Sequence, residues 1–172
     1  KRPKYIPCDI HRSAIKGTNW LVLVGLLEGE PFEIFAGKND SISIPDKLKK
    51  GYIVNITNGR YDLKVPLSPN PVDEDYLVFK DITHLFNNDE QAALTRMLSL
   101  NLRTGTHLQF VVEQLKKSSG SINDFASALA RVLNKYATPV VKRMMKCPNC
   151  ESEDLSTNGC LKCNNCGWER CE

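Results

Sequence analysis

The sequence predicts an α+β fold, in which antiparallel β hairpins are covered by about three helices and followed by a small cysteine-rich ribbon. Three observations support this fold class. β-prone segments fill the first half of the chain, apolar residues at helical spacing follow from Asn88, and cysteines crowd the end from Cys147 onward. We therefore expect two units, an α+β accessory domain at 1–140 and the cysteine-rich ribbon at 141–172.

The first hairpin is predicted from a long apolar run. Residues 1–16 are basic and indicate an approach strand, and 20–27 are almost continuously apolar. Such a run is typical of a strand that is buried on both faces. The Gly- and Pro-containing turn at 28–31 then leads into a second strand at 32–35.

The second hairpin carries a stronger signal. Apolar residues alternate at 52–56 and 61–65 around Asn58-Gly59, a dipeptide that tolerates the positive φ angles of a tight hairpin turn. The Pro- and acid-rich segment 66–75 predicts a surface loop, and 76–82 predicts a further strand.

Helical spacing replaces alternation in the next part of the chain. The first predicted helix runs from Asn88 and is closed by Gly105. Thr106 is placed to cap a second helix, and 122–136 carry the apolar stripe of a third. Residues 138–146 indicate a linker into the cysteine tail.

Composition excludes several classes of protein. With 172 residues, 41% hydrophobic and 25% charged, the chain is neither disordered nor collagen-like. No apolar run approaches the roughly 18 residues of a membrane span, so we expect no membrane partner. A net charge of +3 is too weak to indicate a polyanionic partner, and no glycine-rich phosphate loop is present. The chain begins at Lys1 without Met or a signal peptide, and we expect it to be the C-terminal piece of a longer, cytoplasmic protein.

Cysteine placement is the most informative feature. Of seven cysteines, only Cys8 lies in the first 146 residues. The tail is too short to build its own core and needs a metal or disulfides. Two Cys-x-x-Cys turns, Cys147/Cys150 and Cys163/Cys166, offer four thiolates at a spacing that suits tetrahedral zinc. The tail is therefore predicted to be a zinc ribbon with these four ligands.

The residue after each Cys-x-x-Cys turn often needs positive φ. Gly167 meets this need, whereas Glu151 departs from it.

The remaining tail cysteines, Cys160 and Cys171, admit two interpretations. Nearby cations such as Lys162 and a neighbouring metal lower a thiol pKa, which favours redox work. Alternatively, Cys160 is a small buried apolar residue and Cys171 a terminal thiol. Cys160 also forms a Cys-x-x-Cys with Cys163, so the zinc ligand set is able to exchange. On chemistry alone both interpretations stay open.

A zinc-ribbon module that docks nucleic acid or protein, with no redox role, is a further alternative. Phosphate binding needs a cationic surface. Residues 142–172 hold five basic and five acidic side chains, and four thiolates on one zinc ion add two negative charges. The charge balance therefore speaks against nucleic acid.

No other residues form a recognisable site. His11, His84 and His107 lie far apart and in no ligand spacing. Asp9 and His11 stand near Cys8, but nothing supplies an oxyanion hole or a nucleophile elbow.

Several phrases of the sequence resemble the C-terminal region of ribonucleotide reductases, and of the adenosylcobalamin-dependent (class II) enzymes in particular. These phrases are Lys1-Arg2-Pro3-Lys4, the hairpin ending 30–35, the helical stretches 98–105 and 108–115, and the six-cysteine tail that closes with Cys171.

The resemblance implies a function. The parent enzyme, a ribonucleoside-diphosphate reductase, would make deoxyribonucleotides for DNA replication in an upstream barrel whose cysteine pair is oxidised at each turnover. The tail would bind zinc and also relay reducing equivalents, which favours redox roles for Cys160 and Cys171 by thiol–disulfide exchange. The implied partners are the catalytic barrel of the same or a neighbouring subunit, a dithiol reductant and a second copy of the chain. Adenosylcobalamin would be bound by the parent enzyme and not by this region, which alone should be inactive.

Overall fold

The computed structural model describes residues 2–57, 59–72, 75–86, 88–118, 124–137, 147–152, 154–157 and 160–171. The chain divides into two compact units, Lys1–Ala137 and Thr138–Glu172.

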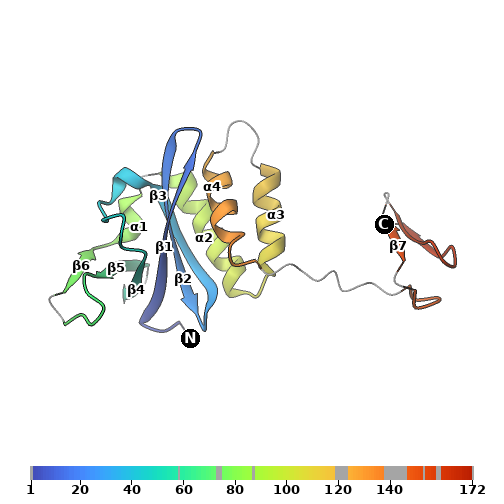
Figure 1. Cartoon of the computed structure of the whole chain (residues 1–172), viewed down its shortest axis with the longest axis horizontal. Coiled ribbons are helices and arrows are strands. Elements are labelled where there is room, and N and C mark those ends of the chain that lie inside the picture. The colour runs from blue at the N-terminus through green and yellow to red at the C-terminus, as the bar shows by residue number, and fades with distance from the viewer. Residues whose placement is uncertain are drawn as a thin grey trace. The chain divides into compact units, whose positions relative to one another are not determined.

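The larger unit is built on one antiparallel sheet of six strands in the order β3-β2-β1-β4-β5-β6 (Figure 1). The strands are β1 (Tyr5–Ile15), β2 (Thr18–Leu27), β3 (Glu30–Lys38), β4 (Lys50–Thr57), β5 (Arg60–Pro66) and β6 (Tyr76–Phe79). A 3-10 turn, η1 (Asn39–Ser41), follows β3. The helices are α1 (Ile82–Leu85), α2 (Asp89–Arg103), α3 (Leu108–Ser118) and α4 (Asp124–Leu133). Strands come first and helices second, which confirms the predicted α+β class.

The first strand has a more central place than the sequence indicates. β1 is paired with β2 on one side and with β4 on the other, so it is no approach strand. The turn that joins β1 to β2 was missed: Lys16 and Gly17 both have positive φ (47° and 81°) and form a two-residue hairpin. The strand predicted at 76–82 ends at Phe79, and Ile82 already begins α1.

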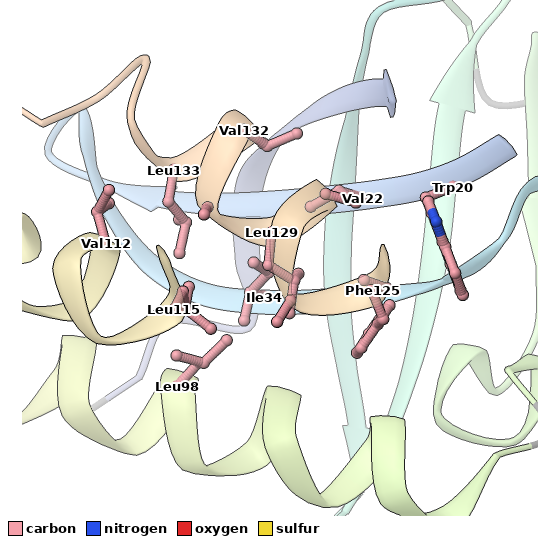
Figure 2. Close-up of a cluster of buried hydrophobic side chains, with 14 of the residues drawn as sticks. Trp20, Val22, Ile34, Leu98, Val112, Leu115, Phe125, Leu129, Val132 and Leu133 are labelled. Atoms are coloured by element: carbon pink, nitrogen blue, oxygen red, sulfur yellow. The ribbon is translucent and has the colours of Figure 1, made fainter. Parts of the chain in front are cut away.

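β2 is buried on both faces, as its composition predicts. Trp20, Val22 and Val24 join a core formed with the long helices, in which Leu129 of α4 is fully buried (Figure 2). Leu21 and the other alternate residues join a second core on the opposite face. That second core is closed by the segment after β3, through Ile42 and Ile44, and by Ile82 and Phe86.

The helix ends are set by local hydrogen bonds. The side chain of Asn88 accepts from the backbone N–H of Gln91 at 2.9 Å and caps α2. Thr106 does not cap α3, because its hydroxyl bonds to Asn101. His107 takes that place, because its ring Nδ1 accepts from the backbone N–H of Gln109 at 3.4 Å. The predicted start of the third helix at residue 122 lies outside the described residues.

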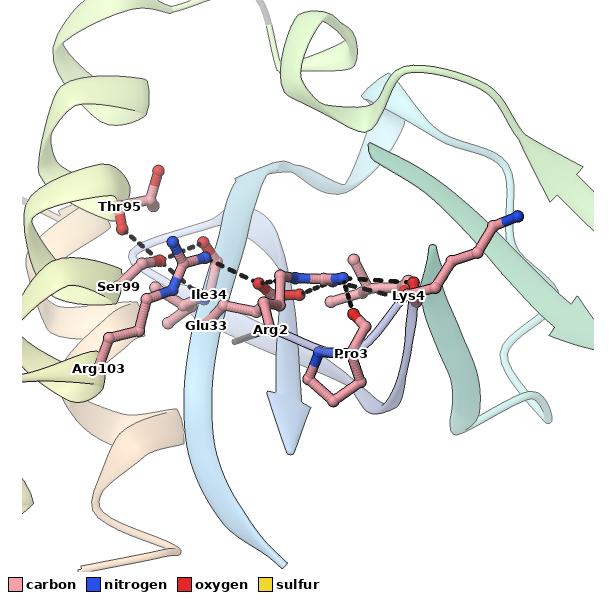
Figure 3. Close-up of polar contacts among 9 residues, drawn as sticks. Arg2, Pro3, Lys4, Glu33, Ile34, Thr95, Ser99 and Arg103 are labelled. Carbon is pink, nitrogen blue, oxygen red and sulfur yellow. Dashed lines mark hydrogen bonds and ion pairs between the residues drawn. The ribbon is translucent and has the colours of Figure 1, made fainter. Parts of the chain in front are cut away.

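Helix α2 covers the open edge of β3 (Figure 3). The Ser99 hydroxyl accepts the backbone N–H of Ile34 at 3.0 Å and donates to the carbonyl of Thr95 at 2.8 Å. Beside it the carboxylate of Glu33, fully buried, accepts from Arg103 at 2.8 Å and from Arg2 at 2.9 Å. A covered edge cannot pair with another chain.

The smaller unit is a three-stranded antiparallel ribbon in the order β7-β8-β9. Its strands are β7 (Leu155–Thr157), β8 (Cys160–Cys163) and β9 (Glu169–Cys171). The predicted linker at 138–146 lies outside the described residues. All the described helices belong to the larger unit, and none of them has the length and apolar character that crossing a bilayer requires.

Candidate metal centre

Four cysteine sulfurs meet at one end of the ribbon. Cys147 and Cys150 precede β7, Cys163 ends β8, and Cys166 lies in the turn that follows. All four sulfurs lie within 4.8 Å of one another. The Sγ–Sγ distances are 3.5 Å for Cys147 and Cys166 and 3.6 Å for Cys150 and Cys163.

These distances fit zinc. Four sulfurs at about 2.3 Å from a tetrahedral ion lie about 3.8 Å apart. Cys147 and Cys163 are fully buried, and thiolate is the ligand that a closed, structural zinc site prefers. The residues that the sequence predicts as ligands are therefore brought together in a geometry that can hold a metal ion such as zinc.

The two Cys-x-x-Cys turns have the same backbone. The N–H of Glu151 donates to the carbonyl of Cys147 at 2.7 Å, and the N–H of Gly167 donates to that of Cys163 at 2.9 Å. Both donors have positive φ, 57° for Glu151 and 74° for Gly167. The sequence predicts this conformation from Gly167, and the first turn adopts it although its residue carries a Cβ.

Asparagine side chains cross between the turns. The Asn149 amide of the first turn donates to Cys166 Sγ at 3.5 Å, and the Asn165 amide of the second donates to Cys150 Sγ at 3.8 Å. Such donors stabilise thiolate sulfur, so both asparagines act on the ligands without being ligands. Sequence reasoning missed this role, although the signal was present in the Asn that each turn places just before its second cysteine.

As free thiols, Cys150 and Cys166 differ in acidity. Donation from the Asn149 side chain, and then from the backbone N–H of Trp168, lowers the pKa of Cys166 to about 6. The pKa of Cys150 is raised to about 11: the backbone N–H of Ser152 lowers it, but desolvation and hydrogen bonds with the other cysteine sulfurs outweigh that contribution. Crowded sulfurs resist carrying four negative charges together, and a divalent cation removes that conflict.

A polar network ties the second turn to the strands. Asn164 donates through its backbone N–H to the Asp154 carbonyl at 3.0 Å and through its amide to the Asp154 carboxylate at 2.9 Å. The backbone N–H of Cys163 donates to the carbonyl of Trp168 at 2.7 Å. These bonds fix where the ligands leave the ribbon.

The other two tail cysteines lie at the opposite end of the β8–β9 hairpin. Cys160 of β8 and Cys171 of β9 are directly opposed in the antiparallel register. Opposed residues in such a pair have Cα atoms about 4.5 to 5.5 Å apart. Disulfides span about 4.4 to 6.8 Å between Cα atoms, so the backbone register permits a disulfide between these two cysteines.

Cys8 takes no part in this arrangement. It lies in the larger unit, 2% exposed in the second core, and burial raises the pKa of its thiol well above the usual range. A buried neutral thiol is a poor nucleophile.

Asp9 and His11 meet through a residue that sequence reasoning did not connect with them. The Tyr136 hydroxyl donates to the Asp9 carboxylate at 2.7 Å and contacts His11 Nε2 at 2.5 Å. Strand alternation places Asp9 and His11 together on the face that Tyr136 contacts, whereas Cys8 belongs to the core on the other face. His84 and His107 are exposed and join no cluster among the described residues.

Comparison with known proteins identifies a family. The model of a protein family described as the NrdJ homologue C-terminal domain matches residues 6–138. Neither a curated protein nor a solved structure matches the chain. The matched segment comprises most of the larger unit and ends before the cysteine ribbon. The chain therefore belongs to the NrdJ homologue C-terminal domain family, the C-terminal domains of proteins related to class II ribonucleotide reductase.

Proposed function

We propose that this chain is the C-terminal region of a ribonucleotide reductase, and that it binds one zinc ion and relays reducing equivalents to the active site of that enzyme. The observation that carries the proposal is the arrangement of the ribbon. One end holds four sulfurs within 4.8 Å of one another, and the other holds two further cysteines in direct register. Family membership supplies the enzyme that such a ribbon would serve.

Zinc has a structural role in this proposal. Cys147, Cys150, Cys163 and Cys166 complete a tetrahedral set and leave no open position for a substrate. Structural zinc supplies about 10 to 16 kcal/mol of apparent binding free energy, which far exceeds what three short strands gain from packing. Cys163 ends β8 and Cys166 lies in the turn that leads to β9, so zinc would also fix the pairing of these two strands.

Cys160 and Cys171 carry the electrons. The thiolate of one attacks the active-site disulfide, forms a mixed disulfide and releases the first active-site thiolate. The second tail thiolate then attacks the mixed disulfide, releases the second active-site thiolate and leaves a Cys160–Cys171 disulfide. Two electrons pass to the active site, and an external dithiol reductant restores the tail by the same exchange.

Partners and setting follow from this chemistry. The ribbon would contact the catalytic barrel of the same or a neighbouring subunit, and a reducing cytoplasm would keep the tail thiols available. Radical chemistry and adenosylcobalamin would belong to the barrel, and none of the steps assigned to this region uses them.

The test uses the complete reductase. Cys160→Ser and Cys171→Ser should each abolish multiple turnover with a dithiol reductant while a single turnover of the pre-reduced enzyme continues. Cys8→Ala is the matched control, because it removes a cysteine that is buried in the other unit, and it should turn over normally. Zinc content by elemental analysis should be one ion per chain in all three variants and should fall in Cys163→Ser.

The two halves of the proposal fail separately. Normal multiple turnover of both Cys160→Ser and Cys171→Ser excludes the relay and leaves the zinc site intact. A substoichiometric zinc content in the unsubstituted protein excludes the metal centre.

A further inference from the structure

The larger unit contains a cavity that the proposed function does not use. It has a volume of about 460 Å³ and lies between α2 and the sheet, with β3, β5 and α1 completing its walls. Cavities that bind small molecules are typically about 300 to 1,000 Å³. Gly37 shapes one wall, since a Cβ at that position would lie 2.2 Å from the Phe86 ring. The glycine lets this ring, which lines the cavity, approach β3 closely.

Three of the residues that line the cavity are aromatic. Phe35, Tyr61 and Phe86 all line the cavity. The Phe35 and Tyr61 rings are inclined at 55° with centroids 5.3 Å apart, and the Arg2 guanidinium lies over the Tyr61 ring at 5.0 Å. Rings held in this way offer apolar, flat contact surface to a ligand at little cost in conformational entropy.

The charged residues lining the cavity have one sign. Arg96 and Arg103, both from α2, are its charged lining residues, and no acidic side chain accompanies them among the described residues that line it. Arg103 is engaged by Glu33 at 2.8 Å, but Glu33 also pairs with Arg2, so one carboxylate faces two guanidinium groups. The cluster of Arg2, Arg103 and Glu33 therefore keeps a net positive charge.

Arg96 adds a second positive charge. No ion pair to it is found among the described residues. The positions that flank it on the same helical face, three and four residues away, are Ala92, Ala93, Ser99 and Leu100, and none is acidic. A guanidinium is a donor with no acceptor, and it matches carboxylate and phosphate oxygens in a bidentate geometry.

We propose that this cavity binds a small ligand that joins a flat aromatic body to an anionic group, either a carboxylate or a phosphate. The aromatic part packs among Phe35, Tyr61 and Phe86, and the anion pairs with Arg96 at the mouth. The site lies wholly within the larger unit and requires neither zinc nor the cysteine pair.

The test is to titrate the zinc-loaded chain with four probes and to monitor binding by ¹H–¹⁵N NMR. The probes are phenyl phosphate, benzoate, phenol and inorganic phosphate. Phenyl phosphate or benzoate should bind at least about tenfold more tightly than phenol or inorganic phosphate, because only they satisfy both parts of the site. The chemical-shift changes should centre on the backbone amides of residues 34–36 and 92–103. Tighter binding of phenyl phosphate indicates a phosphate ligand, and tighter binding of benzoate a carboxylate.

Variants make the test specific. Arg96→Gln should weaken the tighter probe about tenfold, whereas Arg170→Gln, which removes an exposed arginine of the ribbon, should leave its affinity unchanged. Ala92→Met should fill the cavity and abolish binding, with the far-UV circular dichroism of both cavity variants unchanged. Equal binding of phenol and the anions, or an affinity unaffected by Arg96→Gln, would overturn the proposal.

Discussion

The buried Glu33 carboxylate offers a sharp test of how the larger unit is held together. It is fully buried and accepts hydrogen bonds from Arg2, which enters from the N-terminal segment, and from Arg103 at the end of α2 (Figure 3). Glu33→Gln keeps the size of the side chain and one acceptor but removes the charge that two guanidinium groups share. Breaking a buried pair costs about 3 to 5 kcal/mol, because the remaining charges stay desolvated.

The cost here should lie at the lower end of that range. The side chain of Arg103 is 35% exposed and that of Arg2 is 11% exposed, so water relieves part of the loss. We expect Glu33→Gln to lower the free energy of unfolding by about 3 kcal/mol, a large share of the 5 to 15 kcal/mol that is typical of a domain.

Urea unfolding, monitored by circular dichroism at 222 nm, measures this loss of unfolding free energy, because all the described helices belong to the larger unit. The control is Asp46→Asn. That variant breaks an ion pair of Arg12 in which the aspartate is 92% exposed, so it should cost less than about 1 kcal/mol. The reasoning is refuted if the two variants are equally stable.

Three further predictions, two of them with a control variant, concern other parts of the chain. Gly167→Ala should weaken zinc affinity about tenfold in a chelator competition, because alanine disfavours a φ of 74°, whereas Glu151→Gly should bind at least as tightly as the unsubstituted chain. Leu129→Ala should cost about 2 to 5 kcal/mol in urea unfolding, and Leu100→Ala, at a position 53% exposed, much less. Burial, and then Lys135, lower the pKa of His11, so the unfolded chain takes up its proton first as the pH falls. Stability should therefore decline as the pH falls below about 6.5, and His11→Gln should flatten that decline in melting temperatures recorded between neutral and acidic pH.

The sequence predicts the features that depend on local patterns. Alternation around Asn58-Gly59 and the apolar run at 20–27 place strands correctly, since each pattern reports which faces a strand buries. The cysteine spacing predicts the four sulfurs that meet in the ribbon, because two Cys-x-x-Cys turns determine most of the geometry of the cluster.

Features that depend on tertiary contacts escape such reasoning. Nothing local to Glu33 indicates that it would be fully buried, because its partners lie 31 and 70 residues away. The cavity beside Arg96 likewise forms only when α2 lies across the edge of β3. The central place of β1 also depends on pairing with β4, which is distant in sequence.

In the proposed function, zinc and the Cys160/Cys171 pair would act on one hairpin, so the metal should influence electron transfer. The predicted ligands Cys163 and Cys166 lie at the end of β8 and in the turn that follows, while Cys160 and Cys171 are opposed at the other end of the β8–β9 hairpin. With zinc bound, the hairpin would already hold the backbone of Cys160 and Cys171 in register, so forming their disulfide should cost less chain entropy than in a loose tail. A dithiol that oxidises more readily is a stronger reductant.

Replacing all four predicted ligands with serine should therefore shift the reduction potential of the Cys160–Cys171 disulfide to a less negative value, by about 30 mV for each 1.4 kcal/mol of lost preorganisation. Equilibration with defined thiol buffers and mass spectrometry of the cross-linked peptide measures the shift. An unchanged potential would mean that the strands bring these cysteines together without help from the metal.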